Sequence, residues 1–457
     1  MSTFYIEQFG CRATQADGAA IERQLRDQGG TMATDPAAAD VVVLNTCTVT
    51  ATADAQARDA IRKIHAASPS TRIVVTGCYA QRAPDEIAAL PGVTFVVGNS
   101  HKPQIPALLH SISALPHFPH REDALPYHSP SILTGDIFST TDVLVAPVLG
   151  GEGNHTRPTL KIQDGCDSRC SFCVIPFVRG KSRSLPVSTV LSEIRRLAES
   201  GFREIVLSGI NLGTYGRDLA PRVEFLELVR LILGETPVER LRISSIEPLD
   251  VTQDLIDLFA AQDRLAPHFH MPLQSASDRI LAAMHRWYRA EHYARRVELI
   301  CDVLPHAAIG ADVLAGFPGE TEDDHAATLR FIAERPFTYL HVFSYSSRPG
   351  TKAAALADHV PGSVIKRRAR ELRALGEQKA IEFRQSQIGR ALRVLTLHRD
   401  ANDDPASTPA LSGNYLSVLI RERLPHNQWL TVRPAIADGK QLIGLPQLAL
   451  EMTASRA

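Results

Sequence analysis

The chain lacks several features that mark particular classes of protein. No stretch approaches the roughly 20 consecutive apolar residues that a membrane-spanning helix needs, so we expect no membrane segment. The start, MSTFYIEQFGC, lacks the charged-then-apolar pattern of a secretory signal. The 49 Lys and Arg against 50 Asp and Glu give a net charge of −1, without the basic surplus typical of nucleic-acid-binding proteins. We therefore expect a soluble cytoplasmic protein, in which any contact with nucleic acid is local.

Cysteine is also scarce, at seven in 457 residues, but six of the seven fall into two groups of three. In a reducing compartment, cysteines are more often metal ligands or catalytic groups than disulfides. The first group, the compact trio, is Cys166, Cys170 and Cys173 in GCDSRCSFC. A zinc site usually has four protein ligands in two close pairs, and no fourth Cys or His completes this one nearby. Three thiolates can instead hold three irons of a 4Fe-4S cluster and leave the fourth open to a small molecule. A structural zinc knuckle or unligated cysteines are the alternatives.

The second group, the dispersed trio, is Cys11, Cys47 and Cys78, each of which closes a short apolar run. The runs FYIEQFG, VVVLNT and RIVVTG are typical of buried parallel strands. Because the carboxyl ends of parallel strands meet at one edge of a sheet, we expect these three cysteines to converge. Two three-thiolate sites indicate two iron–sulfur clusters and redox or radical chemistry, whereas buried packing cysteines are the alternative.

The order of strand-like and helix-like segments predicts an α/β protein in four parts. Residues 1–105 read as a parallel α/β sheet domain, and 106–155 as an irregular connector rich in Pro and His, with one strand near DVLVAPVL. Residues 156–387 contain six strand candidates separated by helical patterns, which predicts an incomplete TIM-like (β/α)6 barrel. Residues 388–452 are rich in strands and turns and predict a small antiparallel β-barrel. The six barrel strands are expected in TLKIQDG, EIVLSGI, RLRISSIE, HFHMPLQ, AAIGADVLAGF and YLHVFSYS.

The segment KIQDGCDSRCSFCVIPFVRGKSRS resembles the cluster loop of radical S-adenosylmethionine (SAM) enzymes, and more closely that of the methylthiotransferases. Further motifs match landmarks of that family in the same order along the chain. They are FGCRATQADG, LNTCTVT, VTGCYAQR, SGINLGTYG, LRISSIEP, HFHMPLQSASD, ADVLAGFPGETEDD and HVFSYSSRPGT. The motifs KIQDGC and GINLGTYG are similar to those of the bacterial branch of this family that modifies threonylcarbamoyl-adenosine in tRNA.

This resemblance implies an enzyme that adds a methylthio group to carbon 2 of threonylcarbamoyl-adenosine next to the anticodon. It implies two 4Fe-4S clusters and two equivalents of SAM per turnover. One SAM methylates a sulfur at the second cluster, and the other yields the 5′-deoxyadenosyl radical that abstracts hydrogen at carbon 2. The implied partners are the tRNA anticodon stem-loop and an electron donor of the flavodoxin or ferredoxin type. The sequence does not reveal the oligomeric state, and a monomer is the favoured expectation. The central part would be a radical SAM barrel and the last part a TRAM domain.

The resemblance also implies roles for individual residues. The compact trio would ligate the catalytic cluster that binds SAM, and the dispersed trio would ligate the auxiliary cluster. Phe172 would pack beside the SAM adenine or, alternatively, only within its loop. Glycines at strand ends allow close approach of a ligand to the backbone, and polar side chains there can hydrogen-bond it. The remaining expected cofactor contacts are Gly209, Asn211, Ser245, Glu247, Gln274, Ser275 and Gly316.

Other interpretations remain open. The same chemistry on isopentenyl-adenosine in tRNA, or on a ribosomal-protein aspartate, is the first alternative. A non-catalytic iron–sulfur protein that binds RNA or senses redox state is the second. The chain departs from the usual family pattern at Arg169, Thr14 and Ala276, which leaves the six cysteines intact and bears on the choice of acceptor. The basic run at 366–373 either contacts tRNA phosphates or is a solvated helix face.

Overall fold

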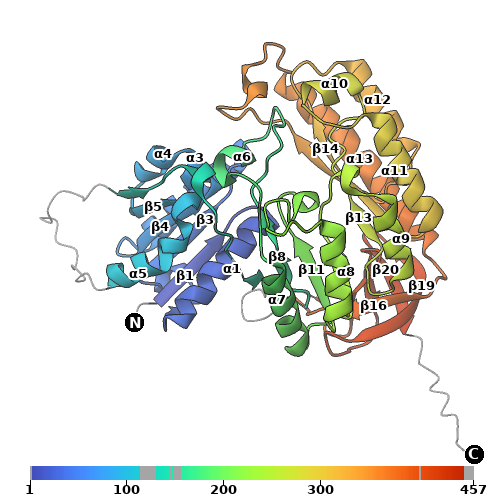
Figure 1. The fold of residues 1–457 in the computed structure, drawn as a ribbon, viewed down its shortest axis with the longest axis horizontal. Coiled ribbons are helices and arrows are strands. Elements are labelled where there is room, and N and C mark those ends of the chain that lie inside the picture. The colour runs from blue at the N-terminus through green and yellow to red at the C-terminus, as the bar shows by residue number, and fades with distance from the viewer. Residues whose placement is uncertain (1–2, 114–129, 145, 149–155, 401–402, 447–457) are drawn as a thin grey trace, which may run out of the picture.

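The computed structural model describes residues 3–113, 130–144, 146–148, 156–400 and 403–446 (Figure 1). About half of the predicted connector, including nearly all of LPHFPHREDALPYHSPS, lies outside these residues, as does the end of the predicted C-terminal part. The residue limits expected for the four parts stay predictions. Among the described residues, no helix is both long and apolar enough to cross a membrane.

The N-terminal part is a parallel sheet with helices on both faces, as predicted (Figure 1, blue). Its strand order is β2-β1-β3-β4-β5-β6. Both faces of β3 and β4 are buried, which is why their sequences are unbroken β-branched runs. The strands are β1 (Thr3–Gln8), β2 (Thr31–Met32), β3 (Val41–Thr46), β4 (Arg72–Gly77), β5 (Val93–Gly98) and β6 (Ser131–Leu133). The helices are α1 (Arg12–Asp27), α2 (Ala51–Ala67), α3 (Cys78–Arg82), α4 (Pro84–Ala88) and α5 (Ile105–Ser113).

Strand β6 comes from the predicted irregular connector. It pairs with β5 over three residues at the sheet edge and is too short to show an alternating pattern in the sequence.

The central part holds all six predicted parallel strands. Parallel pairing joins β8, β11 and β12 in one sheet and β13, β14 and β15 in another, and isolated bridges such as Ser245 to His270 connect β12 with the β13 segment. The result is an incomplete barrel, open between β15 and β8. The strands are β8 (Thr159–Lys161), β11 (Glu204–Ser208), β12 (Arg240–Ile243), β13 (His268–His270), β14 (Ala308–Ala315) and β15 (Tyr339–Ser344).

Helices cover the outside of this barrel and bury one continuous apolar core against the strands. On the β8 side, the short β7 (Pro147–Val148) pairs antiparallel with β8, and α1 of the N-terminal part packs on both strands. The covering helices are α7 (Val187–Glu199), α8 (Phe225–Glu235), α9 (Gln253–Ala261), α11 (Ala290–Val303), α12 (Glu322–Ala333) and α13 (Gly362–Ser386). Shorter elements in the loops are β9 (Gln163–Asp164), α6 (Ile175–Arg179), β10 (Arg183–Ser184) and α10 (Asp278–Ala283).

The C-terminal part is a closed five-stranded barrel in the order β16-β17-β18-β20-β19 (Figure 1, red). Four of its pairings are antiparallel, and a parallel pairing of β18 with β20 completes the ring. Strand β17 has no clear strand pattern in its sequence, because Pro409 interrupts an already short run and proline disfavours a strand interior. The strands are β16 (Leu392–Thr396), β17 (Thr408–Ser412), β18 (Ser417–Ile420), β19 (Trp429–Asp438) and β20 (Gln441–Pro446).

Candidate functional site

The dispersed trio lies at one edge of the N-terminal sheet. Its cysteines follow β1, β3 and β4, which are direct neighbours in that sheet. Cys11 caps the start of α1, Cys47 follows β3 directly, and Cys78 begins α3. Gly10 has a φ of 105°, and a Cβ there would overlap Cys47 Cβ and lie 2.9 Å from Cys47 Sγ. The loop that carries Cys11 therefore touches Cys47, which brings the three cysteines together as the strand pattern predicts.

One thiol in each trio, Cys47 and Cys173, is kept from ionising on its own, mainly by burial. Burial raises the pKa of Cys47 to about 11, and the neighbouring Cys78 and Cys11 add to this shift. In the compact trio, burial together with Cys170 and Cys166 raises the pKa of Cys173 to about 12. A thiolate is the form that binds metal, so cationic iron would have to supply the missing positive charge. Both donor sets fit an iron–sulfur cluster in this respect.

The compact trio occupies the loop between β9 and α6. The Cys166 amide donates to Gly180 O at 3.0 Å, and the Cys173 amide donates to Cys170 O at 3.1 Å, which fixes the loop. Arg286 Nη1 donates to Cys170 Sγ at 3.3 Å. The same guanidinium pairs with Glu247 through Nη2, and its Nε lies 3.3 Å from Tyr288 Oη. Its contacts with Cys170 and Glu247 make Arg286 a candidate site residue that the sequence did not reveal, since an isolated arginine after α10 carries no recognisable pattern.

Neither trio is arranged for a single metal ion. Three sulfurs bound to one zinc at about 2.3 Å would lie within about 4.6 Å of one another. Among the described residues, the only group of three His, Cys, Asp or Glu side chains with ligand atoms within 4.8 Å of one another is His270, Asp312 and His341. The wider spacing of the sulfurs favours a multi-iron cluster over the zinc knuckle.

Two of the expected cofactor contacts lie after β11, beside the compact trio. Asn211 Nδ2 lies 3.9 Å from Cys166 Sγ, and the Asn211 amide donates to Gln163 Oε1 at 2.8 Å. Asn211 Oδ1 is buried and has no hydrogen-bond partner among the described residues. At Gly209, a Cβ would lie 2.8 Å from Leu212 Cδ2 and 3.0 Å from Gln163 Oε1, so any larger residue would have to displace these side chains.

Two further contacts lie after β12. Ser245 is half-buried and bridges to the His270 backbone. Burial raises the pKa of Glu247, and Arg286 counteracts that shift.

The remaining expected contacts lie between β13 and α13. Gln274 has a φ of 63° and its amide donates to Asp312 O at 2.7 Å. Ser275 is buried, and its hydroxyl lies 3.4 Å from Thr328 Oγ1 and accepts from the Ser277 amide, so it organises the turn before α10. At Gly316, a Cβ would overlap Ile365 of α13, and this close approach of a helix explains the glycine. Phe172 packs edge-on against Phe317, with ring centroids 6.4 Å apart.

Aromatic and imidazole side chains line the barrel interior between these sites. Tyr339 Oη lies 2.7 Å from His268 Nε2 and 2.9 Å from His270 Nδ1, and His270 Nε2 lies 2.9 Å from Asp312 Oδ1. Tyr415 of the small barrel packs against His268 in a tilted arrangement, with ring centroids 4.5 Å apart. Arg12, the residue after Cys11, donates to Tyr415 Oη at 3.3 Å. We call His268, His270, Tyr339, His341 and Tyr415 the aromatic wall.

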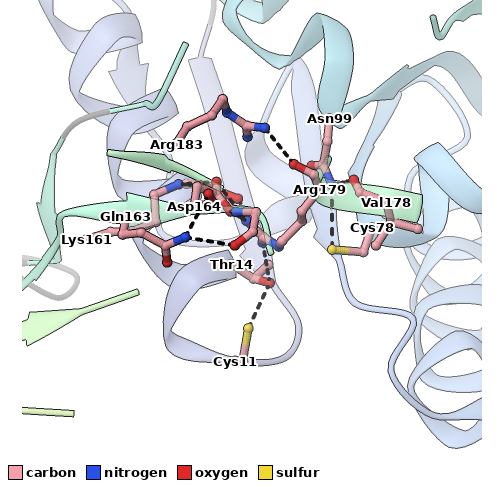
Figure 2. Close-up of polar contacts among 12 residues, drawn as sticks. Cys11, Thr14, Cys78, Asn99, Lys161, Gln163, Asp164, Val178, Arg179 and Arg183 are labelled. Carbon is pink, nitrogen blue, oxygen red and sulfur yellow. Dashed lines mark hydrogen bonds and ion pairs between the residues drawn. The ribbon is translucent and has the colours of Figure 1, made fainter. Parts of the chain in front are cut away.

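A buried group of charges lies beside the dispersed trio, and Figure 2 shows part of it, with Lys161, Asp164 and Arg179 near Cys11 and Cys78. Asp17 of α1 accepts from Lys102 Nζ at 2.8 Å and Arg179 Nη2 at 3.0 Å, and it also pairs with Lys161. Asp164 accepts from Lys161 Nζ at 2.8 Å and from Arg179 Nη1 at 2.9 and 3.0 Å. Burial opposes ionisation of Asp17, but Lys102, Lys161 and Arg179 hold its pKa well below the usual value. We call Asp17, Lys102, Lys161, Asp164 and Arg179 the junction charge group.

The basic run on α13 is only partly available to RNA. Arg368 is 2% exposed and pairs with Glu320 at 2.8 Å and with Glu322 at 2.7 Å. Arg367 pairs with Glu322 and Glu371. Lys366 and Arg370 are exposed. Both interpretations of the run, phosphate contact and a solvated helix face, are therefore wrong for Arg368.

Comparison with known proteins matches this layout. The profile of the uncharacterized protein family UPF0004 matches residues 3–98, and that of the radical SAM superfamily matches residues 160–332. The threonylcarbamoyladenosine tRNA methylthiotransferase MtaB of Aquifex aeolicus (strain VF5) is 38% identical over 86% of this chain and 93% of that protein. MtaB of Bacillus subtilis (strain 168) is 36% identical, over 86% of this chain and 85% of its own length.

A relative named for a different acceptor is also similar to this chain. The tRNA-2-methylthio-N(6)-dimethylallyladenosine synthase of Acidothermus cellulolyticus is 36% identical over 90% of this chain and 80% of that protein. Among solved structures, the radical SAM methyltransferase TsrM from Kitasatospora setae, with tryptophan and a SAM analog bound, superposes with a TM-score of 0.54 at 15% identity. The superposition covers 87% of this chain and 79% of that one, and it supports the fold alone.

Proposed function

Because this chain belongs to the radical SAM methylthiotransferase family, we propose that it adds a methylthio group to carbon 2 of threonylcarbamoyl-adenosine in tRNA. The full-length similarity to two MtaB proteins supports this acceptor. One structural observation supports the chemistry most directly. Cys78 of the dispersed trio packs in one buried cluster with Val174 and Val178, which follow the compact trio on α6. The two cysteine sites therefore adjoin across a packed contact.

The family binds SAM and 4Fe-4S clusters, and we assign Cys166, Cys170 and Cys173 to the catalytic cluster. The auxiliary cluster is assigned to the dispersed trio. When bound, these groups supply the electron, the radical and the sulfur. The chain's own contribution is to hold the two centres and the acceptor base in a fixed arrangement that excludes water.

Polar groups around the compact trio are placed to hold SAM. The unpartnered Asn211 Oδ1 can accept a hydrogen bond from an ammonium group, and Glu247 can do the same when it is ionised. Arg286 places a positive charge beside Cys170 and keeps Glu247 oriented. We propose that these three residues orient SAM at the open iron.

The aromatic wall is the proposed place for the acceptor base. Unstacked RNA bases bind on aromatic side chains, and this wall extends from the β12–β13 strand ends to Arg12 beside Cys11. The C-terminal barrel contributes Tyr415 to it, so a TRAM-like domain would take part in holding the anticodon stem-loop. A cytoplasmic location, a monomeric chain and a flavodoxin- or ferredoxin-type electron donor complete the proposal.

The test is mass analysis of tRNA nucleosides from cells that lack the protein. We expect loss of 2-methylthio-threonylcarbamoyl-adenosine with accumulation of its unthiolated precursor. Persistence of the modified nucleoside would contradict this acceptor, and loss of the isopentenyl-type product would favour the alternative that the dimethylallyladenosine synthase suggests.

Two cysteine variants test the cluster assignments in the purified protein. We expect Cys170→Ala to abolish formation of 5′-deoxyadenosine, whereas Cys47→Ala should retain it and lose thiolation. The readouts are iron content, 5′-deoxyadenosine yield and product yield under anaerobic conditions. Wild-type protein that binds iron but never forms 5′-deoxyadenosine would point to the non-catalytic alternative.

A further inference from the structure

The junction charge group carries an excess of positive charge in a buried place. It contains three cations and two carboxylates, and each side chain is at most 9% exposed. Burying an unbalanced charge is costly unless an opposite charge lies close by. Among the described residues, the recorded ion pairs of these cations are all with Asp17 and Asp164. The carboxylates therefore leave one positive charge unmatched.

The excess charge lies toward the dispersed trio. Arg179 Nη2 donates to Thr14 Oγ1 at 3.3 Å, and Thr14 Oγ1 lies 3.6 Å from Cys11 Sγ. On the other side, Asn99 Nδ2 donates to Val178 O at 2.7 Å and lies 3.6 Å from Cys78 Sγ. Figure 2 shows Cys11 reached through Thr14 and Cys78 reached through Asn99. Thr14 is one of the positions where this chain departs from the usual family pattern.

A 4Fe-4S centre held by three thiolates is anionic, and its reduction adds a further electron. A fixed cation nearby stabilises the reduced form more than the oxidised form, because Coulomb attraction grows with the negative charge. Arg179 never loses its proton in a protein, so its charge is permanent. Its planar fork also grips Asp164 and Asp17 at once, which ties α1 to the loop of the compact trio.

We propose that Arg179 is a positioning residue that raises the reduction potential of the centre at Cys11, Cys47 and Cys78 and holds that centre against α6. The guanidinium is fixed by Asp17 and Asp164. Together with Lys102 and Lys161, the group has a net positive charge. This inference rests on the proposed auxiliary cluster and does not depend on which adenosine is the acceptor.

The experiment measures the auxiliary centre alone. Full-length protein in which Cys166, Cys170 and Cys173 are Ala is reconstituted anaerobically, and the midpoint potential is followed by electron paramagnetic resonance. In this background, R179Q removes the charge, R179K keeps it without the fork, and K102M removes one charge without touching a cysteine contact. R368Q is the matched control, because Arg368 is an equally buried, carboxylate-paired arginine far along the chain on α13.

We expect R179Q to shift the midpoint to a more negative potential, with roughly tenfold less reduced centre at a fixed potential. K102M should shift it in the same direction by less, and R179K and R368Q should leave it near the wild-type value. The thermal unfolding temperature should fall by similar amounts in R179Q and R368Q. A change in midpoint potential that is seen only in R179Q therefore does not result from lost stability alone.

An unshifted midpoint in R179Q with full iron content overturns the inference. If R179Q does not retain iron, K102M decides: a negative shift supports the inference and an unchanged midpoint overturns it. Failure of the parent background to bind any cluster would instead refute the assignment of the auxiliary cluster.

Discussion

Two buried groups of charges in this molecule have a similar composition and different surroundings. The base charge group lies at the amino ends of the barrel strands, where Glu204 pairs with Arg157, Arg240 and Arg242. It too has more cations than carboxylates. There the C-terminal barrel supplies partners: Arg242 donates to Gly413 O at 2.9 Å and Ser412 O at 3.1 Å, and Trp429 lies under Arg240 with 4.4 Å to the ring centroid.

Among the residues that the structure describes, no such set of carbonyls surrounds the lysines of the junction charge group. Lys161 contacts Asp17 and Asp164, and Lys102 contacts Asp17 and, at 3.5 Å, Asn45 Oδ1. The base charge group is thus completed by the neighbouring C-terminal barrel. For the junction charge group, the proposed auxiliary cluster would supply the balancing negative charge.

Among the changes that test the difference between the two charge groups, Asp17→Asn is expected to lower the stability of the protein most. It leaves three buried cations with one carboxylate, and removing one partner of a buried ion pair typically costs about 3–5 kcal/mol. Denaturant unfolding of the reconstituted protein should show a loss of this size, together with reduced iron at the dispersed trio. A stability close to the wild type would mean that the junction charge group is not balanced by Asp17.

Glu204→Gln should be less damaging, at about 3 kcal/mol or less, because its arginines keep their carbonyl and aromatic partners. Iron content and midpoint potential should not change. An iron loss equal to that of Asp17→Asn would erase the distinction between the two groups.

Acid sensitivity gives a smaller effect with a defined sign. Burial raises the pKa of Asp17, but its cations lower it further, so the folded-state pKa lies below the unfolded value near 3.8. The stability that Asp17 contributes is thus complete above about pH 4–5 and is lost as pH falls below about 4, by up to about 1.4 kcal/mol per pH unit. The unfolding free energy of Asp17→Asn should therefore fall less steeply below pH 4 than that of the wild type. Parallel curves would contradict the depressed pKa.

The smallest effect is expected from Trp429→Leu. The indole lies 4.4 Å from Arg240 and 4.2 Å from Arg393, measured from Cζ to the ring centroid, and such contacts are worth about 1 kcal/mol each. The thermal unfolding temperature should fall slightly, and the iron content of both cysteine sites should not change. A change in iron content would show that the C-terminal barrel influences the junction after all.

The sequence predicts the strands and the meeting of the cysteines well, because both follow from local patterns. Unbroken runs such as VVVLNT indicate buried parallel strands, and the chain order then places Cys11, Cys47 and Cys78 at one edge. The junction charge group could not be predicted in this way. Asp17, Lys102 and Arg179 are isolated charges far apart in the chain, and only the packing of α1 on the barrel brings them together.

Arg368 shows the opposite error. In the sequence, Arg368 cannot be distinguished from the other basic residues of its run. In the structure it faces Glu320 and is buried. The helical periodicity alone does not tell which charge of such a run turns inward.

The placement of Cys11, Cys47 and Cys78 after three adjoining strands has a consequence for how this site tolerates change. Neighbouring strands lie about 4.8 Å apart, so the hydrogen-bonded backbone of the sheet determines the distances between the three cysteines. Insertions or deletions in the helices and loops between the strands would leave these distances unchanged, whereas a shift of one strand by one residue would change them.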